Sequence, residues 1–105
     1  MLSPQAMVLR DGQEQMIPAR DIVPGDILVL SPGAKVAADG IVVRAAELQV
    51  DESVLTGESV PVAKDGGKSG RNVFAGTSVI AGRAEARVTA TGAKTEFGKI
   101  AHLTG

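Results

Sequence analysis

The chain has 105 residues, enough for one hydrophobic core but too few for a second, so we expect a single domain. Its formal net charge of −1 and its 2% aromatic content argue against nucleic-acid binding, which needs a basic surface and stacking side chains. The absence of cysteine excludes disulfides and thiolate metal sites, and no apolar run reaches the roughly 18 residues of a membrane-spanning helix.

The first half of the chain predicts short strands separated by turns. Asp11-Gly12 is a strong hairpin signal, and Pro24-Gly25-Asp26 predicts a second tight turn before an aliphatic strand. Asp39-Gly40 and Ala45-Ala46 are expected to separate three further strands. We expect the strands of this half at residues 5–10, 15–17, 27–30, 35–37, 41–44 and 47–50.

The second half predicts further strands and one terminal helix. Gly76 and Gly82 are expected to break the strands, and a helix is predicted from Thr95, its N-cap, to about Leu103. Many short strands with turn signals favour an all-β fold, which leaves a sandwich, a closed sheet or a jelly roll as alternatives. The strands of this half are expected near residues 72–75, 78–80 and 84–90.

Residues 64–71, Lys-Asp-Gly-Gly-Lys-Ser-Gly-Arg, are interpreted as a surface loop because they contain no large apolar side chain. Gly67-Lys68-Ser69 does not fit a phosphate-binding P-loop, because Val62 stands where that motif needs a glycine and no helix-forming stretch follows. A contact with a neighbouring domain or an anionic ligand stays open for the cations expected to be exposed there, Lys64, Lys68 and Arg71.

The most informative stretch is residues 50–62, Val-Asp-Glu-Ser-Val-Leu-Thr-Gly-Glu-Ser-Val-Pro-Val. Gly57 permits a sharp turn, and the apolar residues on both sides favour extended backbone. This pattern predicts that Glu58 lies at the tip of a rigid β scaffold and points outward. A carboxylate held in this way is suited to chemistry outside the domain, whereas the alternative interpretation is a solvated turn glutamate.

Residues 50–53 and 55–59 with Pro61-Val62 resemble the signature of the actuator domain of P-type cation-transporting ATPases. The resemblance covers nearly the whole chain and implies a distorted jelly roll, or double-stranded β-sandwich, with one short C-terminal helix. It implies that residues 1–105 form a single actuator domain between two transmembrane helices of a larger P-type ATPase. Five further stretches agree with the family in order, at residues 22–27, 38–40, 72–77, 90–92 and 95–101.

The resemblance also implies a catalytic site. In the family, the position of Glu58 orients the water that hydrolyses an aspartyl-phosphate held by a separate domain. Gly57 would let the backbone approach the phosphate, and Thr56 would hydrogen-bond the water or the phosphate. Ser59 is either a fourth site residue or a local cap of the turn.

The acidic residues before the loop are assigned a structural role. Asp51 and Glu52 cannot pair with each other as carboxylates, because adjacent residues of a strand point to opposite faces. Asp51 or Ser53 is expected to brace the backbone of the loop. Asp39 is expected to be a strand-end carboxylate, and the sole histidine, His102, excludes a histidine metal cluster or nucleophile triad.

Other parts of the implied protein are missing from this chain. The family's phosphorylated aspartate lies in an Asp-Lys-Thr-Gly-Thr motif that this sequence lacks, so we expect the isolated chain to be an inactive, soluble monomer. The implied partners are the phosphorylation domain, the nucleotide-binding domain and the transmembrane helices of the same polypeptide. ATP and Mg²⁺ are implied for the full-length protein, with no cofactor or metal in this domain. The domain is expected to lie on the cytoplasmic side of a membrane.

Several questions stay open. The transported ion is unknown because its ligands lie in membrane helices, and Ala34 and Ala37 depart from the residues common in the family, which leaves the subclass open. A stand-alone β-sandwich binding module is a second possible function, although the aromatic platform that it predicts has no Trp or Tyr here. A third is a small hydrolase using Glu58 with Asp51 or Glu52.

Overall fold

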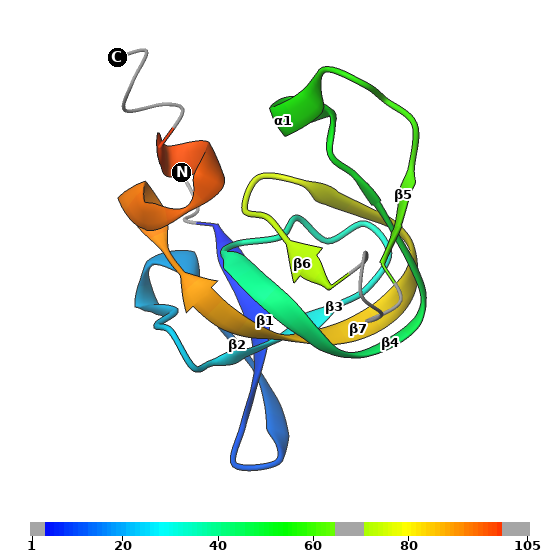
Figure 1. Cartoon of the computed structure of the whole chain (residues 1–105). Helices are drawn as coiled ribbons and strands as arrows, with labels where there is room; N and C mark the ends of the chain where they lie inside the picture. The colour runs from blue at the N-terminus through cyan, green and yellow to red at the C-terminus, as the bar shows by residue number, and fades with distance from the viewer. Residues whose placement is uncertain (1–3, 65–70, 100–105) are drawn as a thin grey trace.

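The computed structural model describes residues 4–64 and 71–99, and its strands form one curved antiparallel sheet (Figure 1). The strand order is β2-β1-β3-β7-β4-β5, with β6 paired to β4 outside this path. The predicted all-β class is therefore confirmed. The strands are β1 (Gln5–Arg10), β2 (Gln13–Pro18), β3 (Ile27–Leu30), β4 (Asp39–Asp51), β5 (Val62–Lys64), β6 (Asn72–Val73) and β7 (Ser78–Ala90).

The long strands β4 and β7 form the centre of the sheet and carry its irregularities. They pair from Asp39 opposite Ala90 to Asp51 opposite Ser78, with several register shifts that mark β-bulges. The strand breaks predicted at Ala45-Ala46 and at Gly82 are wrong, because the bulges absorb the irregular residues without ending either strand. The strand predicted at residues 35–37 is also wrong, since only an isolated bridge from Lys35 to Ser78 forms.

Gly82 lies opposite the β-bulge that β4 forms between Ala46 and Gln49. Its φ is +81°, and Glu47 opposite it has a φ of +53°. A Cβ atom built on Gly82 would overlap the backbone carbonyl of Glu47. A glycine is therefore required here both for its conformation and for the close approach of the two strands.

The core is aliphatic, as the composition predicts. Burial alternates along β3, where Leu28 and Leu30 are buried and Ile27 and Val29 are half-buried. Aromatic side chains contribute little, because Phe74 is half-buried and Phe97 is exposed. The largest fully buried side chains are Leu28, Leu48, Val8, Val36, Val50, Val73, Val88 and Thr77.

The N-terminal hairpin turns at Asp11-Gly12, and both residues have the positive φ that this turn signal predicts. Arg10 binds Asp26 through two hydrogen bonds, from Nε to Oδ1 at 3.2 Å and from Nη2 to Oδ2 at 2.8 Å. These bonds, together with the N–H of Val23, hold the pKa of the Asp26 carboxyl below its usual value. The predicted turn before β3 is thus tied to the hairpin.

The buried carboxylate of Asp39 joins three distant segments. As predicted, Asp39 lies at a strand end, where Oδ1 accepts the N–H of Ala75 at 2.9 Å and Oδ2 accepts the N–H of Glu96 at 2.8 Å. Thr95 is the predicted N-cap, since its Oγ1 accepts the N–H of Gly98 at 2.9 Å and residues 96–99 are helical. The remainder of the predicted helix, with His102, lies outside the described residues.

Candidate functional site

The motif loop, residues 52–61, leaves the end of β4 as a helical turn and returns to the sheet at β5 (Figure 1). The extended backbone predicted before Gly57 is wrong, because Ser53–Thr56 form the short helix α1. Asp51 Oδ1 accepts the N–H of Ser53 at 2.8 Å, so the predicted bracing by Asp51 is confirmed. That N–H lowers the pKa of the Asp51 carboxyl.

Gly57 ends α1 in the left-handed conformation, with φ of +77°, and its N–H donates to the carbonyl of Ser53 at 2.8 Å. This is the C-terminal cap that glycine forms without a Cβ penalty. The predicted sharp turn at Gly57 is therefore confirmed. The chain turns at Gly57, so Glu58 no longer continues the helix.

Thr56 stabilises the loop from within. Its Oγ1 accepts the N–H of Glu58 at 3.1 Å, and its hydroxyl lies 3.2 Å from the carbonyl of Glu52 and 3.4 Å from that of Glu58, either of which can accept its proton. The hydroxyl thus connects the first turn of α1 to the backbone of Glu58. In this conformation the Thr56 hydroxyl is engaged by the loop itself.

Glu58 lies at the exposed tip of the loop, together with Ser59, Val60 and Pro61. Within the part of the chain that the structure describes, no hydrogen bond or ion pair engages the Glu58 carboxylate. Val60 is 69% exposed, so this tip does not pack back onto its own sheet. The carboxylate is therefore available to a group outside the domain.

The base of the motif loop contains a buried ion pair that the sequence did not predict. Lys64 Nζ lies 2.9 Å from Glu52 Oε2, with side chains 7% and 11% exposed. Oε2 has no well-aligned hydrogen-bond donor, so the two groups attract as charges rather than through a linear hydrogen bond. The Lys64 ammonium also lies 5.3 Å from the centroid of the Phe74 ring, within cation–π range.

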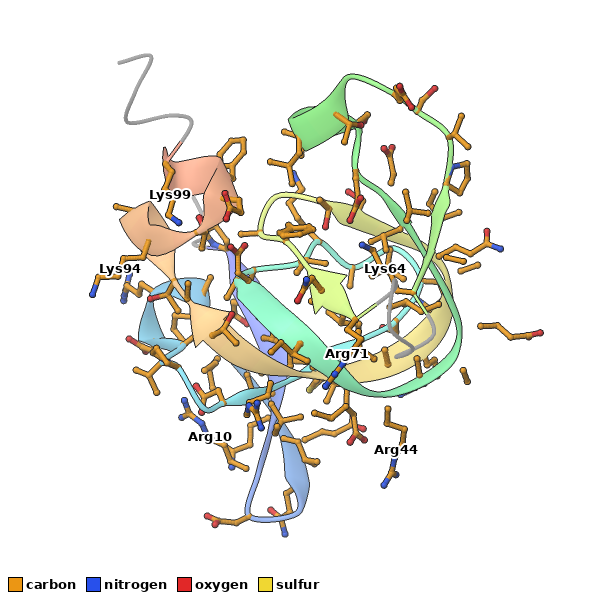
Figure 2. All side chains as sticks on the ribbon, in the orientation of Figure 1. Arg10, Arg44, Lys64, Arg71, Lys94 and Lys99 are labelled. Atoms are coloured by element: carbon orange, nitrogen blue, oxygen red, sulfur yellow. The ribbon has the colours of Figure 1, made fainter. Side chains whose placement is uncertain are left out.

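The prediction that Lys64 is exposed in a surface loop is wrong. Lys64 is the last residue of β5 and pairs with Leu48 of β4, and in Figure 2 it lies between ribbons while Lys94 projects outward. Side chains alternate between the two faces of a strand, so Lys64 faces the same side as the apolar Val62. This spacing is the sequence signal that could have indicated the burial of Lys64. Arg71 is exposed as predicted, and Gly67-Lys68-Ser69 lies outside the described residues.

Two hollows of the domain lie away from the motif loop. One hollow is lined by Met7 of β1, Met16 of β2 and Leu28 of β3, and another lies beside Arg44 and Glu85. Neither includes a residue of the motif loop. Within residues 4–64 and 71–99, no three histidine, aspartate or glutamate side chains gather to hold a metal ion. Glu58 is the exposed carboxylate of this loop, and it lies beside exposed backbone.

An all-β domain that presents the Glu58 carboxylate on an exposed loop is suited to act on a second protein surface. The chain belongs to the P-type ATPase actuator domain family, which it matches over residues 1–105. The resemblance inferred from its motifs is therefore confirmed. None of the helices within the described residues is long and apolar enough to cross a membrane.

Relatives by sequence are named as ATPases. The chain is 44% identical over 99 residues to the "Probable plasma membrane ATPase" of Dictyostelium discoideum, which covers 94% of this chain and 9% of that protein. It is 44% identical over 112 residues to "Calcium-transporting ATPase lmo0841" of Listeria monocytogenes, which covers 98% of this chain and 13% of that protein. The chain thus spans about a tenth of the length of these relatives.

The fold is also similar to that of solved transporters. A crystal structure of a zinc-transporting PIB-type ATPase in the E2.Pi state matches with a TM-score of 0.82 and 28% identity, over 96% of this chain and 16% of that one. A second crystal structure of a zinc-transporting PIB-type ATPase, in another state, matches with a TM-score of 0.81 and 29% identity, over 97% and 16% of the two chains. These matches agree with the all-β fold of the actuator domain.

Proposed function

We propose that this domain works within a cation-transporting P-type ATPase, where Glu58 positions and activates the water that hydrolyses an aspartyl-phosphate on another domain. The observation that carries the proposal is the exposure of the Glu58 carboxylate at the tip of a loop whose base is bonded to the sheet. Phosphoryl transfer needs an in-line oxygen nucleophile, and a carboxylate within hydrogen-bond reach can orient a water and accept its proton.

The neighbouring residues support this role in different ways. Gly57 leaves its side of the turn open, since no atom lies within 4 Å of a Cβ built there, so a phosphoryl group can approach the backbone. Thr56 fixes the backbone of Glu58 and can turn its hydroxyl toward the water or phosphate once the loop docks. Ser59, exposed beside Glu58, is the fourth residue of the proposed site.

The remaining machinery belongs to other parts of the same polypeptide. The described residues offer no cluster of carboxylates for Mg²⁺, so ATP, Mg²⁺ and the phosphorylated aspartate are assigned to the nucleotide-binding and phosphorylation domains. The domain would lie on the cytoplasmic side of the membrane, between two transmembrane helices. Rotation of the rigid sheet would carry Glu58 to the phosphoenzyme and pull on the transport path at the same time. Alone, the chain would be inactive.

The test is phosphoenzyme decay in the full-length transporter carrying Glu58→Gln. We expect the phosphoenzyme to form normally and to decay about 10²–10⁴-fold more slowly, because general-base help of this kind contributes a factor of that size. Glu14→Gln, an exposed acid on the hairpin far along the sheet, is the matched control and should leave decay unchanged. Decay of the Glu58→Gln phosphoenzyme at the normal rate would contradict the proposal.

A second assay separates the actuator role from a self-sufficient hydrolase. The purified 105-residue chain is offered a phosphoester and a glycoside at high protein concentration. We expect no turnover of either substrate. Turnover that disappears with Glu58→Gln would support the hydrolase instead.

A further inference from the structure

We propose that Lys64 is a positioning residue for Glu58, which it holds in place through Glu52 and Thr56. The inference rests on the proposed function of Glu58 and adds to it a buried residue, at the base of the motif loop, that determines the position of Glu58. Lys64 touches no reacting atom, and it acts by fixing the direction in which the exposed tip is presented.

The setting of Lys64 is costly for an ammonium group. The residue is only 6% exposed and lies beside Phe74, with one carboxylate, that of Glu52, within ion-pair distance. A buried ion pair often contributes no more stability than apolar side chains of similar volume. Glu52 is the first residue of the loop and Lys64 lies on β5, the strand that follows the loop. Their ion pair therefore fixes the two sides of the loop relative to each other, which apolar side chains would do less specifically.

A continuous chain of contacts leads from Lys64 to Glu58. The Lys64 ammonium holds the Glu52 side chain at 2.9 Å. The Glu52 carbonyl accepts the N–H of Leu55 at 2.9 Å and that of Thr56 at 3.1 Å, and the Thr56 hydroxyl lies 3.2 Å from it. Thr56 Oγ1 in turn accepts the N–H of Glu58 at 3.1 Å. Each link fixes the backbone that the next one depends on.

Backbone pairing alone does not hold the loop. The ladder between β4 and β5 is three residues long, and its last pair joins Val50 to Val62. The Asp51–Ser53 bond braces the outgoing side only. The Glu52–Lys64 pair spans from the first residue of the motif loop to the returning strand, so it closes the loop from one side to the other.

Loss of Lys64 would leave the Glu52 carboxylate buried without its cation. Such a group gains by turning toward water, and that movement would shift the Glu52 carbonyl, which accepts the first hydrogen bonds of α1. A displacement of about 1 Å at a reacting group can cost about 10²-fold in rate. We therefore expect Lys64→Met to slow phosphoenzyme decay by about 10–100-fold while phosphoenzyme formation from ATP is unchanged.

The experiment is a double-mutant cycle in the full-length transporter, with decay measured for Lys64→Met, Glu58→Gln and both together. If Lys64 acts through Glu58, the combined variant decays no more slowly than Glu58→Gln alone. Independent effects that multiply would overturn the inference. Lys99→Met is the matched control, because Lys99 also pairs with a glutamate, Glu96, at 3.8 Å, but both side chains are more than half exposed.

A second variant covers the case in which Lys64→Met fails to form phosphoenzyme. Glu52→Leu combined with Lys64→Met replaces the ion pair with apolar side chains and removes the unpaired charge. We expect this pair of substitutions to restore phosphoenzyme formation but to leave decay slow, and normal decay would overturn the inference. If Glu58→Gln is slow and the Lys64 variants are normal, only the positioning role fails. If Glu58→Gln itself decays normally, the proposed function fails.

Discussion

The tip of the motif loop and the strand pair β4–β7 are built in opposite ways. Residues 57–61 are all exposed, and the hydrogen bonds that hold Gly57 and Glu58 reach back no further than Ser53 and Thr56. β4 and β7 are 13-residue strands that pair along most of their length and bury alternate aliphatic side chains. The proposed chemistry therefore lies on an exposed segment with few contacts, and rigidity comes from the well-packed central strand pair.

This contrast explains how one domain can be both rigid and reactive. A group that must dock onto a second protein surface cannot be buried in its own core, so the residues of the tip stay exposed and make few packing contacts. The loop nevertheless keeps a defined conformation, because it is short and is held at its base by Asp51 and the Glu52–Lys64 pair. Stability measurements on variants at the tip, in the strand pair and outside both regions test this contrast.

The largest expected effect comes from a matched pair of truncations. Leu48→Ala, at a β4 residue only 1% exposed, should lower the free energy of unfolding by about 2–5 kcal/mol, because it opens a cavity in the core. Val60→Ala, at the tip, should change it by about 0.5 kcal/mol or less. Urea unfolding of the chain measures both. Similar losses at the two sites would mean that the tip is packed more tightly than its exposure indicates.

The second effect concerns the bulge that lets β4 and β7 stay continuous. Gly82→Ala should destabilise the chain by about 2–3 kcal/mol, because the methyl group overlaps the Glu47 carbonyl and the φ is left-handed. Gly12→Ala is the control, since its φ is +76° but nothing lies within 4 Å of the added Cβ. We expect about 1 kcal/mol there from backbone strain alone. Equal losses would show that crowding at the bulge is unimportant.

The smallest effect is a pH dependence away from the loop. The pKa of Asp26 is lowered in the folded chain by its hydrogen bonds from Arg10, so this interaction stabilises the fold at pH values above the unfolded pKa of about 3.9. The contribution is lost as the pH falls through the folded pKa. Asp26→Asn should therefore be less stable than the parent at pH 7, and the two should converge toward pH 3. A constant difference in urea midpoints over that range would contradict this assignment.

Much of the local structure could be predicted from the residues. The hairpin at Asp11-Gly12, the cap at Thr95 and the reversal at Gly57 follow from backbone preferences that act within a few residues. The predicted break at Gly82 failed for a related reason, because a glycine in a strand can mark either an end or a bulge. Only the strand opposite, with Glu47 at the matching position, distinguishes the two.

For this protein, the order of residues was enough to establish the all-β class, the aliphatic core, the family and the position of Glu58 in a glycine turn. These depend on composition and short-range conformation. The folded sheet was needed to establish that β4 and β7 are continuous, that Lys64 is buried against Glu52, and that Asp39 reaches a helix 57 residues away. Such contacts form only when folding brings distant segments together and withdraws them from water, and short-range patterns do not record that geometry.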